Sequence, residues 1–282
     1  MYSKIPHSTR YNRHVTVKDN WRRLVAEIAA AGTPRGRARL GCCSLEGIRL
    51  FERALRAGVS IENCVVTDAL LNQPSLRERG LLELLEAAGC QPVVVPSPVM
   101  AELTGGRGTG DIVGLAAMPP QPSLEKLLMA TDAAPVFLGG IHIDDPGNVG
   151  ALVRTAHASG SSGLLTVGAT DAFHPRAVRT SMGSVFRQPI LRWDTMNEML
   201  SDLREHGVRT LAAVSDGGTP LPAVARVSGP CAVFLGSEAF GLETSFQESV
   251  DERVTIPMAH GVDSLSVNAA AAVLLYALKN GR

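Results

Sequence analysis

The fold is decided by the stretch VFLGGIHIDDPGNVGALVRTAHASGSSGLLTVGA, which covers residues 136–169. An apolar run at 136–143 leads into a turn-forming Asp-Pro-Gly and then into apolar residues at helical spacing over 149–160. A second apolar run follows at 163–169. Near-continuous apolar strands separated by a helix are typical of a parallel sheet that is covered on both faces.

The same alternation continues along the rest of the chain. Further strands are expected at 190–193, 208–216, 231–238 and 253–258, and further helices at 175–187, 196–207 and 267–280. The sequence therefore predicts an α/β fold whose C-terminal domain, residues 135–282, is built on a parallel sheet.

A smaller α/β unit is predicted for residues 37–118. Its expected helices are 44–58 and 77–89, and its expected strands are 61–68, 91–96 and 112–118. Residues 119–134 begin with three prolines in four positions and are expected to be a linker.

Residues 1–36 are interpreted as a basic N-terminal extension, although 21–32 favours a short helix. Residues 1–40 hold nine Lys or Arg and two acids, while the formal net charge of the chain is zero. Such an uneven charge indicates contact with a polyanion such as RNA, the alternative being a solvated leader. The candidate RNA contacts in this segment are Arg10, Arg13, Arg22 and Arg23.

Several classes of protein are disfavoured. No apolar run approaches the roughly 20 residues that span a bilayer, and the polar N-terminus lacks the apolar core of a secretion signal. The five cysteines show no C-x-x-C spacing, which favours reduced thiols over disulfides or a zinc site. We expect a cytoplasmic protein without membrane contact and without a metal.

The first candidate loop is DDPGNVGALVRTA, residues 144–156. Asn148 stands where a helix N-cap is expected, and the free amides at that helix end suit an anion such as an RNA phosphate. Arg154 lies within two helical turns, from where its guanidinium reaches back toward the loop. A capped helix with a surface arginine is the alternative.

The second candidate loop is VFLGSEAFGL, residues 233–242. A glycine at the carboxyl end of a strand, here Gly236, lets a ligand approach the backbone, and open α/β sheets bind ligands at that edge. Glu238 is then either a ligand or helix-end contact or a solvated loop acid.

The third candidate loop lies in VTIPMAHGVDSLSVNAAAAVLLY, residues 254–276, where a strand stops at Pro257 and an alanine-rich helix follows. Ser264, Ser266 and Asn268 place hydroxyl and amide groups around the start of that helix. Helix capping accounts for at least one of them.

In this order the three loops resemble the motifs of the TrmH/SpoU family, within the SPOUT class of trefoil-knotted methyltransferases. The pattern N-x-G-x-x-x-R-T-A is met over 148–156, L-G-x-E-x-x-G-L over 235–242, and I-P-M-x-x-x-x-x-S-L over 256–265. The upstream segments LEGIRLFERALRAG and GDIVGLA resemble the family's ribosomal-protein-like substrate-binding domain. The resemblance covers about residues 40–282.

The resemblance implies an RNA ribose 2'-O-methyltransferase that uses S-adenosylmethionine and works as a homodimer, with the closing helix in the interface. Ribosomal RNA is favoured over transfer RNA because of the N-terminal domain. The implied catalytic residues are Asn148, Arg154, Glu238 and Ser264, and the implied RNA contacts are Asn148, Arg154, Ser266 and Asn268. The implied cofactor-binding residues are Leu235, Gly236, Gly241, Ile256, Met258, Ser264 and Leu265.

Within that site, Arg154 is expected to grip a phosphate and stabilise the developing 2'-alkoxide, because a guanidinium holds its proton too tightly to act as a base. Glu238 is expected to orient Arg154 or the loop, while Asn148 and Ser264 fix the ribose and the phosphate.

One position departs from the family pattern. Members usually read S-L-N-V-S in the last motif, whereas this chain has serine at 266 and asparagine at 268. The alternative function is therefore a non-catalytic RNA-binding knot protein whose methyl transfer is impaired by Ser266. A third hypothesis, an enzyme with a nicotinamide or nucleotide cofactor, predicts a glycine-rich phosphate loop after the first strand, and the sequence lacks a convincing one.

Overall fold

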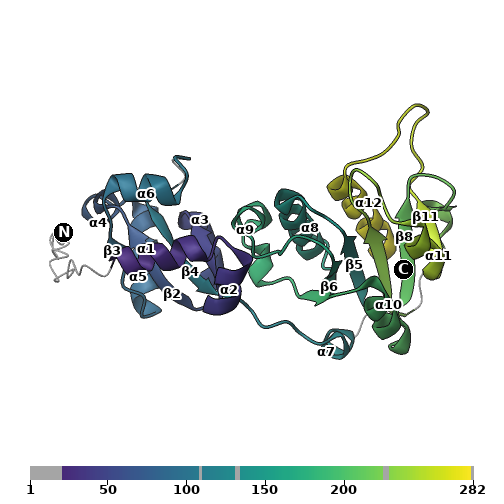
Figure 1. Ribbon diagram of the computed structural model, residues 1–282, viewed down its shortest axis with the longest axis horizontal. Helices are drawn as coiled ribbons and strands as arrows, with labels where there is room; N and C mark the ends of the chain where they lie inside the picture. The colour runs from purple at the N-terminus through teal and green to yellow at the C-terminus, as the bar shows by residue number, and fades with distance from the viewer. Residues whose placement is uncertain (1–20, 108–109, 131–133, 225–228, 281–282) are drawn as a thin grey trace, which may run out of the picture.

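The computed structural model describes residues 21–107, 110–130, 134–224 and 229–280. Within these residues the strands form two separate sheets, one of four strands and one of seven. Figure 1 shows the two sheets in the two halves of an elongated molecule, joined by a connection that carries α7 (Leu124–Met129). The mixed α/β class expected from the sequence is confirmed.

The N-terminal half is a small sheet flanked by helices. Its strand order is β1-β4-β2-β3; β4 is antiparallel to both β1 and β2, and β3 is parallel to β2. Its elements are α1 (Trp21–Ala30), α2 (Pro34–Leu40), β1 (Cys42–Glu46), α3 (Ile48–Arg56), β2 (Ile61–Val66), α4 (Asp68–Asn72), α5 (Leu76–Ala87), β3 (Val93–Val94), α6 (Ser97–Leu103) and β4 (Ile112–Ala117).

Two of these helices lie where the sequence indicated a basic extension. Ile28 and Ala31 are buried in one cluster with Val65 of the sheet, and α1 contacts α2, β2 and β4. The Thr33 hydroxyl caps α2. The boundary expected at residue 36 is therefore wrong for the described part of this segment, because α1 and α2 pack onto the N-terminal sheet.

The expected linker also contains a helix. Leu124 and Leu127 of α7 are buried in the same apolar cluster as Phe137 and Leu165 of the C-terminal sheet. The Ser123 hydroxyl caps α7 by accepting the backbone N–H of Lys126. This part of the connection is thus anchored to the C-terminal half.

The C-terminal half is organised by a sheet of order β7-β6-β5-β10-β8-β11-β9, in which every neighbouring pair of strands is parallel. Its elements are β5 (Val136–Ile141), α8 (Pro146–Ala158), β6 (Gly163–Val167), α9 (Pro175–Ser181), η1 (Ser184–Phe186), β7 (Ile190–Trp193), α10 (Met196–Glu205), β8 (Arg209–Val214), β9 (Thr219–Pro220), η2 (Leu221–Ala223), β10 (Cys231–Leu235), α11 (Thr244–Ser249), β11 (Glu252–Thr255) and α12 (Val267–Asn280).

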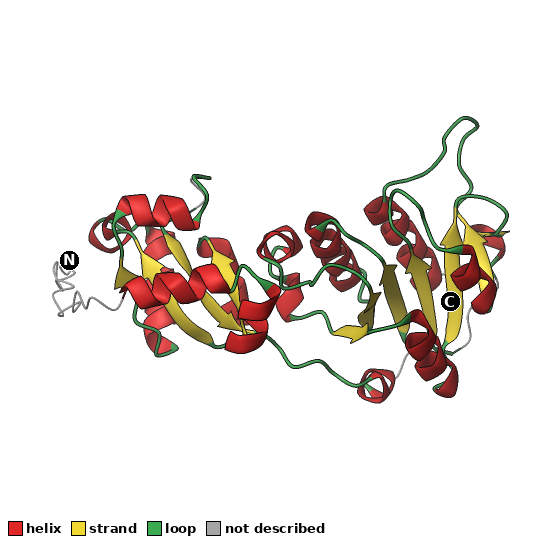
Figure 2. Cartoon of the chain, viewed as in Figure 1, coloured by secondary structure: helices red, strands yellow, loops and turns green. Residues whose placement is uncertain are grey.

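Burial follows the expectation for a parallel sheet. Every residue of β5, β6 and β10 is buried, and Figure 2 shows helices on both sides of the C-terminal strands. The single helix expected at 175–187 is wrong, because Met182 and Gly183 take positive φ angles of 52° and 81° and separate α9 from η1. Two successive left-handed residues cannot continue a right-handed helix.

The order of the strands creates a switch point between β5 and β10. After β5 the chain forms β6, which pairs with one edge of β5. The other edge of β5 pairs with β10, and the strand that follows β10 in the sequence, β11, lies further out in the same direction, beyond β8. After β11 the chain returns across the sheet to α12, which contacts α8, β5 and β10. Open α/β sheets bind ligands at the carboxyl ends of the strands at such a point. The trefoil knot expected for these segments stays a prediction.

Ion pairs connect the two halves. Arg37 of α2 is 1% exposed, and its Nε lies 2.7 Å from the Asp171 carboxylate, which precedes α9. Arg179 of α9 lies 3.1 Å from Glu46 of β1. These contacts fix α9 against the N-terminal sheet (Figure 1). Within the described residues, no helix is both long and apolar enough to span a bilayer.

Candidate active site

The three motif loops lie at one edge of the parallel sheet. They follow the carboxyl ends of β5, β10 and β11, and parallel strands present these ends on the same side. The first and second loops flank the switch point between β5 and β10.

Asp145, and not Asn148, caps α8. The Asp145 carboxylate accepts the backbone N–H of Asn148 at 3.0 Å, and Pro146 occupies the first turn. The expectation of an Asn148 cap is wrong because the Asp-Pro-Gly turn already belongs to the helix. The amide of Asn148 is consequently available for contacts with other loops.

Gly150 lets α8 approach α9 closely. A Cβ at this position would lie 2.3 Å from the carbonyl oxygen of Ala177. The glycine of the first motif therefore has a packing reason that is independent of ligand binding.

The second motif folds into a tight loop. The Gly241 N–H donates to the Ser237 carbonyl at 2.8 Å, and the Phe240 N–H donates to the Ser237 hydroxyl at 3.2 Å. A Cβ on Gly236 would lie 2.1 Å from the carbonyl carbon of Gly241, whose own φ is +67°. Both glycines are thus needed to close the loop, which leaves Phe240 92% exposed and Glu238 at the surface.

The third motif ends in a capped helix. The Ser266 hydroxyl accepts the backbone N–H of Ala269 at 3.3 Å at the start of α12, as the capping alternative expected for one residue of this group. Ser264 and Leu265 are exposed in the preceding loop, while Ile256 and Met258 are half-buried near its beginning.

The three motifs are joined by side-chain hydrogen bonds. The Asn148 amide nitrogen donates to the Glu238 carboxylate, and the Asn268 amide nitrogen donates to the Asn148 amide oxygen at 3.2 Å. These residues are separated by 90 and 120 positions in the chain. Three of the polar residues singled out from the sequence therefore meet at the switch point.

Arg154 and Ser264 are placed differently. Both side chains are exposed, and within the described residues no hydrogen bond joins either of them to Glu238. The hydrogen-bond partner of Glu238 is Asn148, so the expected contact of Glu238 with Arg154 is not formed in this structure. The expectation that Glu238 orients the loop stays a prediction. Arg154 presents a solvent-facing guanidinium on α8.

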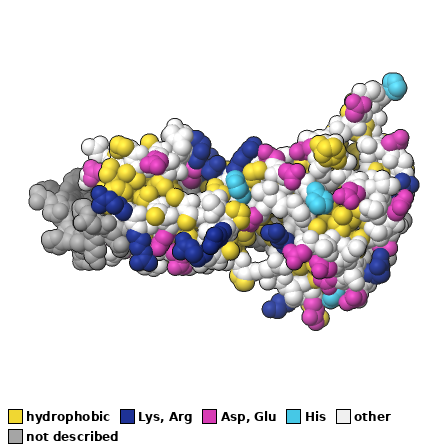
Figure 3. Space-filling model, in the orientation of Figure 1, with side chains coloured by type: hydrophobic (Ala, Val, Ile, Leu, Met, Phe, Trp, Pro, Cys, Tyr) yellow, Lys and Arg dark blue, Asp and Glu magenta, His cyan; other side chains and the backbone are white. Residues whose placement is uncertain are grey.

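The basic residues of the N-terminal segment lie partly outside the described structure. Arg10 and Arg13 fall in residues 1–20, outside the described residues. Arg22 and Arg23 are exposed on α1, where Arg22 stacks 4.9 Å from the Trp21 ring centroid and Arg23 pairs with Glu27 at 3.0 Å. On the face shown in Figure 3, acidic side chains are more numerous over the C-terminal half.

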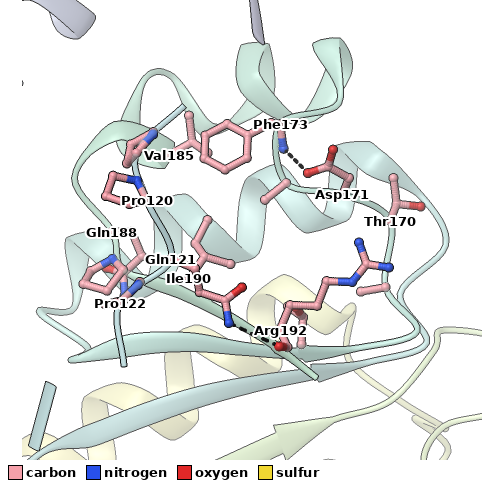
Figure 4. Close-up of a pocket in the computed structure, with 15 residues that line it drawn as sticks. Pro120, Gln121, Pro122, Thr170, Asp171, Phe173, Val185, Gln188, Ile190 and Arg192 are labelled. Atoms are coloured by element: carbon pink, nitrogen blue, oxygen red, sulfur yellow. Dashed lines mark hydrogen bonds between the residues drawn. The ribbon is translucent and has the colours of Figure 1, made fainter. Parts of the chain in front are cut away.

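A cavity of about 180 Å³ lies elsewhere, under the connection between the halves. Figure 4 shows Pro120, Pro122 and Phe173 around it, with Asp171 and Arg192 at its polar side. Its described lining contains none of the motif residues, so we place the site at the hydrogen-bonded loops and not here. Among the described residues no group of acidic, histidine and cysteine side chains is arranged to hold a metal ion.

Two residues of this region were missed by the sequence interpretation. Asp145 acts as the cap of α8 and also pairs with Arg176 at 2.9 Å. Asp171 anchors the loop after β6 to Arg37 of the other half. The Asp-Pro pair before the first motif was a signal for the former, because aspartate before proline is typical of a helix start. No local sequence pattern indicated the role of Asp171.

The structure thus defines an α/β domain in which three motif loops meet at the switch point of a parallel sheet. Its chain belongs to the SpoU rRNA Methylase family, whose model matches residues 135–276. The resemblance carried by the three motifs is confirmed.

Similar proteins match along nearly the whole chain. The 23S rRNA (guanosine(2553)-2'-O)-methyltransferase RlmP of Bacillus subtilis is 27% identical over 264 residues, which cover 93% of this chain and 95% of that protein. The 23S rRNA (uridine(2479)-2'-O)-methyltransferase of Streptomyces viridochromogenes is also 27% identical, covering 88% and 86%. The AdoMet-bound rRNA methyltransferase of Sinorhizobium meliloti has 26% identity and a TM-score of 0.77, covering 91% and 94%.

Proposed function

We propose that this protein transfers the methyl group of S-adenosylmethionine to a ribose 2'-hydroxyl of RNA, with ribosomal RNA as its substrate. The family and the two similar 23S rRNA 2'-O-methyltransferases support this function. The observation that carries it is the hydrogen-bonded set Asn148, Glu238 and Asn268, which brings all three family motifs to one point of the sheet edge.

The residues at this edge fit the cofactor. The buried Oδ1 of Asn268 has no hydrogen-bond partner in the described residues, and the exposed Leu265 offers apolar surface. Backbone groups of the tight loop at Gly236 and Gly241 would hold the adenine and methionine ends together with Leu235, Ile256 and Met258, and Ser264 would add a hydroxyl. The bound cofactor supplies a methyl group on a positively charged sulfur, which is already activated for transfer.

The task of the protein side chains is then to position the ribose. Arg154, with its exposed guanidinium, would bind the phosphate next to the target nucleotide and stabilise negative charge on the 2'-oxygen. Asn148, fixed by Glu238, and Ser264 would orient the ribose, while Ser266 and the exposed Arg22 and Arg23 would extend the contact with RNA.

A second copy of the chain is proposed to complete the site. Apolar side chains are exposed on the second and third motif loops and on α12, namely Phe240, Val262, Leu265, Val273 and Tyr276. Val273 and Tyr276 lie one helical turn apart on the same face of α12, and Tyr276 is 72% exposed. Burying this surface in a homodimer removes it from water. Sedimentation of Val273→Asp should show monomers if the interface is correct, and an unchanged dimer would contradict it.

A trefoil knot of the motif segments and a cytoplasmic location are part of the same proposal. The return of the chain from β11 to α12 supports the knot, and the five buried cysteine thiols support a reducing compartment.

Methyl transfer is tested with the purified protein, labelled S-adenosylmethionine and two substrates, total ribosomal RNA and total transfer RNA. We expect 2'-O-methylation of ribosomal RNA, mapped by mass spectrometry, at a nucleotide that is unmodified in cells lacking the protein. Binding of RNA without transfer would contradict the proposal and favour the non-catalytic alternative; transfer to transfer RNA alone would contradict the substrate class.

A further inference from the structure

Three side chains that are far apart in the sequence are joined by two consecutive hydrogen bonds with the same donor-to-acceptor direction. Asn268 lies in the first turn of α12, Asn148 in the first turn of α8, and Glu238 in the loop after β10. The amide nitrogen of Asn268 donates to the Asn148 oxygen, and the amide nitrogen of Asn148 donates to Glu238.

The carboxylate of Glu238 sets the direction of both hydrogen bonds. A carboxylate only accepts hydrogen bonds, so Asn148 must turn its NH₂ group toward Glu238. Its amide oxygen then faces Asn268, which must in turn present its own NH₂ group. The orientation of the Asn148 amide is thereby fixed from both ends.

The contact with Asn148 leaves the other polar atom of the Asn268 amide without a hydrogen-bond partner among the described residues. That atom, Oδ1, is buried. A buried acceptor without a partner lowers stability and offsets what the hydrogen bond to Asn148 contributes, so the fold alone gains little from Asn268. The unpartnered acceptor at this point indicates a role in the site.

Ser266 makes a different hydrogen bond and forms none with Asn148 among the described residues. Its hydroxyl accepts the backbone N–H of Ala269 and begins α12. The family pattern has its asparagine at the position of Ser266, whereas here the only motif asparagine of this loop stands two residues later and still reaches Asn148 at 3.2 Å.

The geometry points to Asn268 as a positioning residue: it holds the amide of Asn148, and through it Glu238, in the orientation that methyl transfer requires, and so replaces the missing asparagine at 266. This inference rests on the proposed function. It also implies that Ser266 does not by itself make the protein inactive.

The test uses the full chain with three substitutions and one control. Asn268→Ala removes the donor, Asn268→Asp keeps the size but offers an acceptor to an acceptor, and the exchange Ser266→Asn with Asn268→Ser restores the family order. Asn197→Ala, at an exposed position of α10, is the matched control. Turnover and apparent RNA affinity are measured together with S-adenosylmethionine binding by calorimetry and thermal stability.

For Asn268→Ala and Asn268→Asp we expect kcat to fall about 100-fold, the loss typical of misplacing a reacting group by about an ångström. Cofactor affinity should stay unchanged in Asn268→Asp, which keeps an oxygen at the position of Oδ1, and Asn268→Ala should melt close to the temperature of the wild type. The exchanged variant should recover part of the lost rate. Wild-type turnover in both single variants, or a rate loss that only follows a lower melting temperature, would overturn the inference.

A second readout separates this inference from the proposed function. In protein labelled with ¹⁵N-asparagine, the side-chain amide signals of Asn148 should shift in Asn268→Ala and Asn268→Asp and stay in place in Asn197→Ala. Unshifted Asn148 signals would refute the positioning contact even in a protein without turnover. Absence of turnover in the wild type, with shifted signals in the variants, would refute the proposed function and leave the contact established.

Discussion

Arg37 donates its Nε to the carboxylate of Asp171, 2.7 Å away, across the junction between the two sheets. Its Nη1 donates to the Ala31 carbonyl at 3.0 Å, while its buried Nη2 has no hydrogen-bond partner in the described residues. Asp171 is therefore the group that compensates a guanidinium that is almost completely removed from water.

Removing the Asp171 carboxylate should lower the free energy of unfolding more than removing the Arg37 guanidinium. Asp171→Ala leaves a buried charge without its partner, and we expect the free energy of unfolding to fall by about 3 kcal/mol. Arg37→Met replaces the charge by an apolar side chain and should lose clearly less. Urea denaturation of both variants provides the comparison; equal losses, or a larger loss for Arg37→Met, would argue against this account.

Arg154 is expected to act on transfer and not on cofactor binding. Because its guanidinium is exposed on α8, Arg154→Ala should leave the fold intact and lower kcat about 100- to 1000-fold, as for the loss of one transition-state donor. Arg204→Ala, at an exposed site on α10, is the control. Tritiated-methyl transfer and calorimetry with S-adenosylmethionine measure the two effects, and full turnover of Arg154→Ala would exclude the role.

Two helical glycines should respond to alanine with opposite signs. At Gly150 the new methyl group would meet the Ala177 carbonyl at 2.3 Å, so we expect Gly150→Ala to lose about 1–3 kcal/mol through overpacking. At Gly80 in α5 nothing lies within 4 Å, and Gly80→Ala should gain about 0.5–1 kcal/mol from helix propensity. Thermal unfolding distinguishes the two. A stabilised Gly150→Ala would show that α8 and α9 are not packed this closely.

The side chain of His174 should make the free energy of unfolding depend on pH. Burial, and then the positive charge of Arg37, lower the pKa of His174 below its ordinary value of about 6.5. The unfolded chain therefore binds a proton at a higher pH than the folded protein. The contribution of His174 to stability is fully present above about pH 6.5 and declines as the pH falls through the window between the unfolded and the lowered folded pKa.

The substitution His174→Asn keeps an acceptor for the Arg176 N–H that His174 now caps at 3.2 Å. Between about pH 7 and pH 5.5 its melting temperature should fall less than that of the wild type. Melting temperatures that fall equally in the two proteins over this pH range would rule out the assignment to His174.

Much of the C-terminal fold follows from local patterns. The fully buried strands β5, β6 and β10 were expected from continuous apolar runs, and the meeting of Asn148 with Glu238 agrees with the order of the motifs. Parallel strands bring their carboxyl ends together, so loops far apart in sequence are predictable neighbours.

Other features depend on tertiary contacts that local patterns do not encode. Arg37 belonged to a segment rich in arginine, and nothing local distinguished it from its exposed neighbours; only Asp171, 134 positions later, explains its burial. The helix α7 is short, and its capping Ser123 was obscured by the preceding prolines. The break after α9 depends on the left-handed conformation of Met182, a residue type without a preference for it.

The hydrogen bond between Asn148 and Asn268 has a consequence for biosynthesis. Asn268 leaves the ribosome 120 residues after Asn148, which at usual elongation rates is on the order of ten seconds. Toward the end of this interval the nascent chain has β5, α8 and β10 but lacks the helix α12 that packs against them. Newly made chains therefore form the contact between Asn148 and Asn268 only after α12 has left the ribosome and docked.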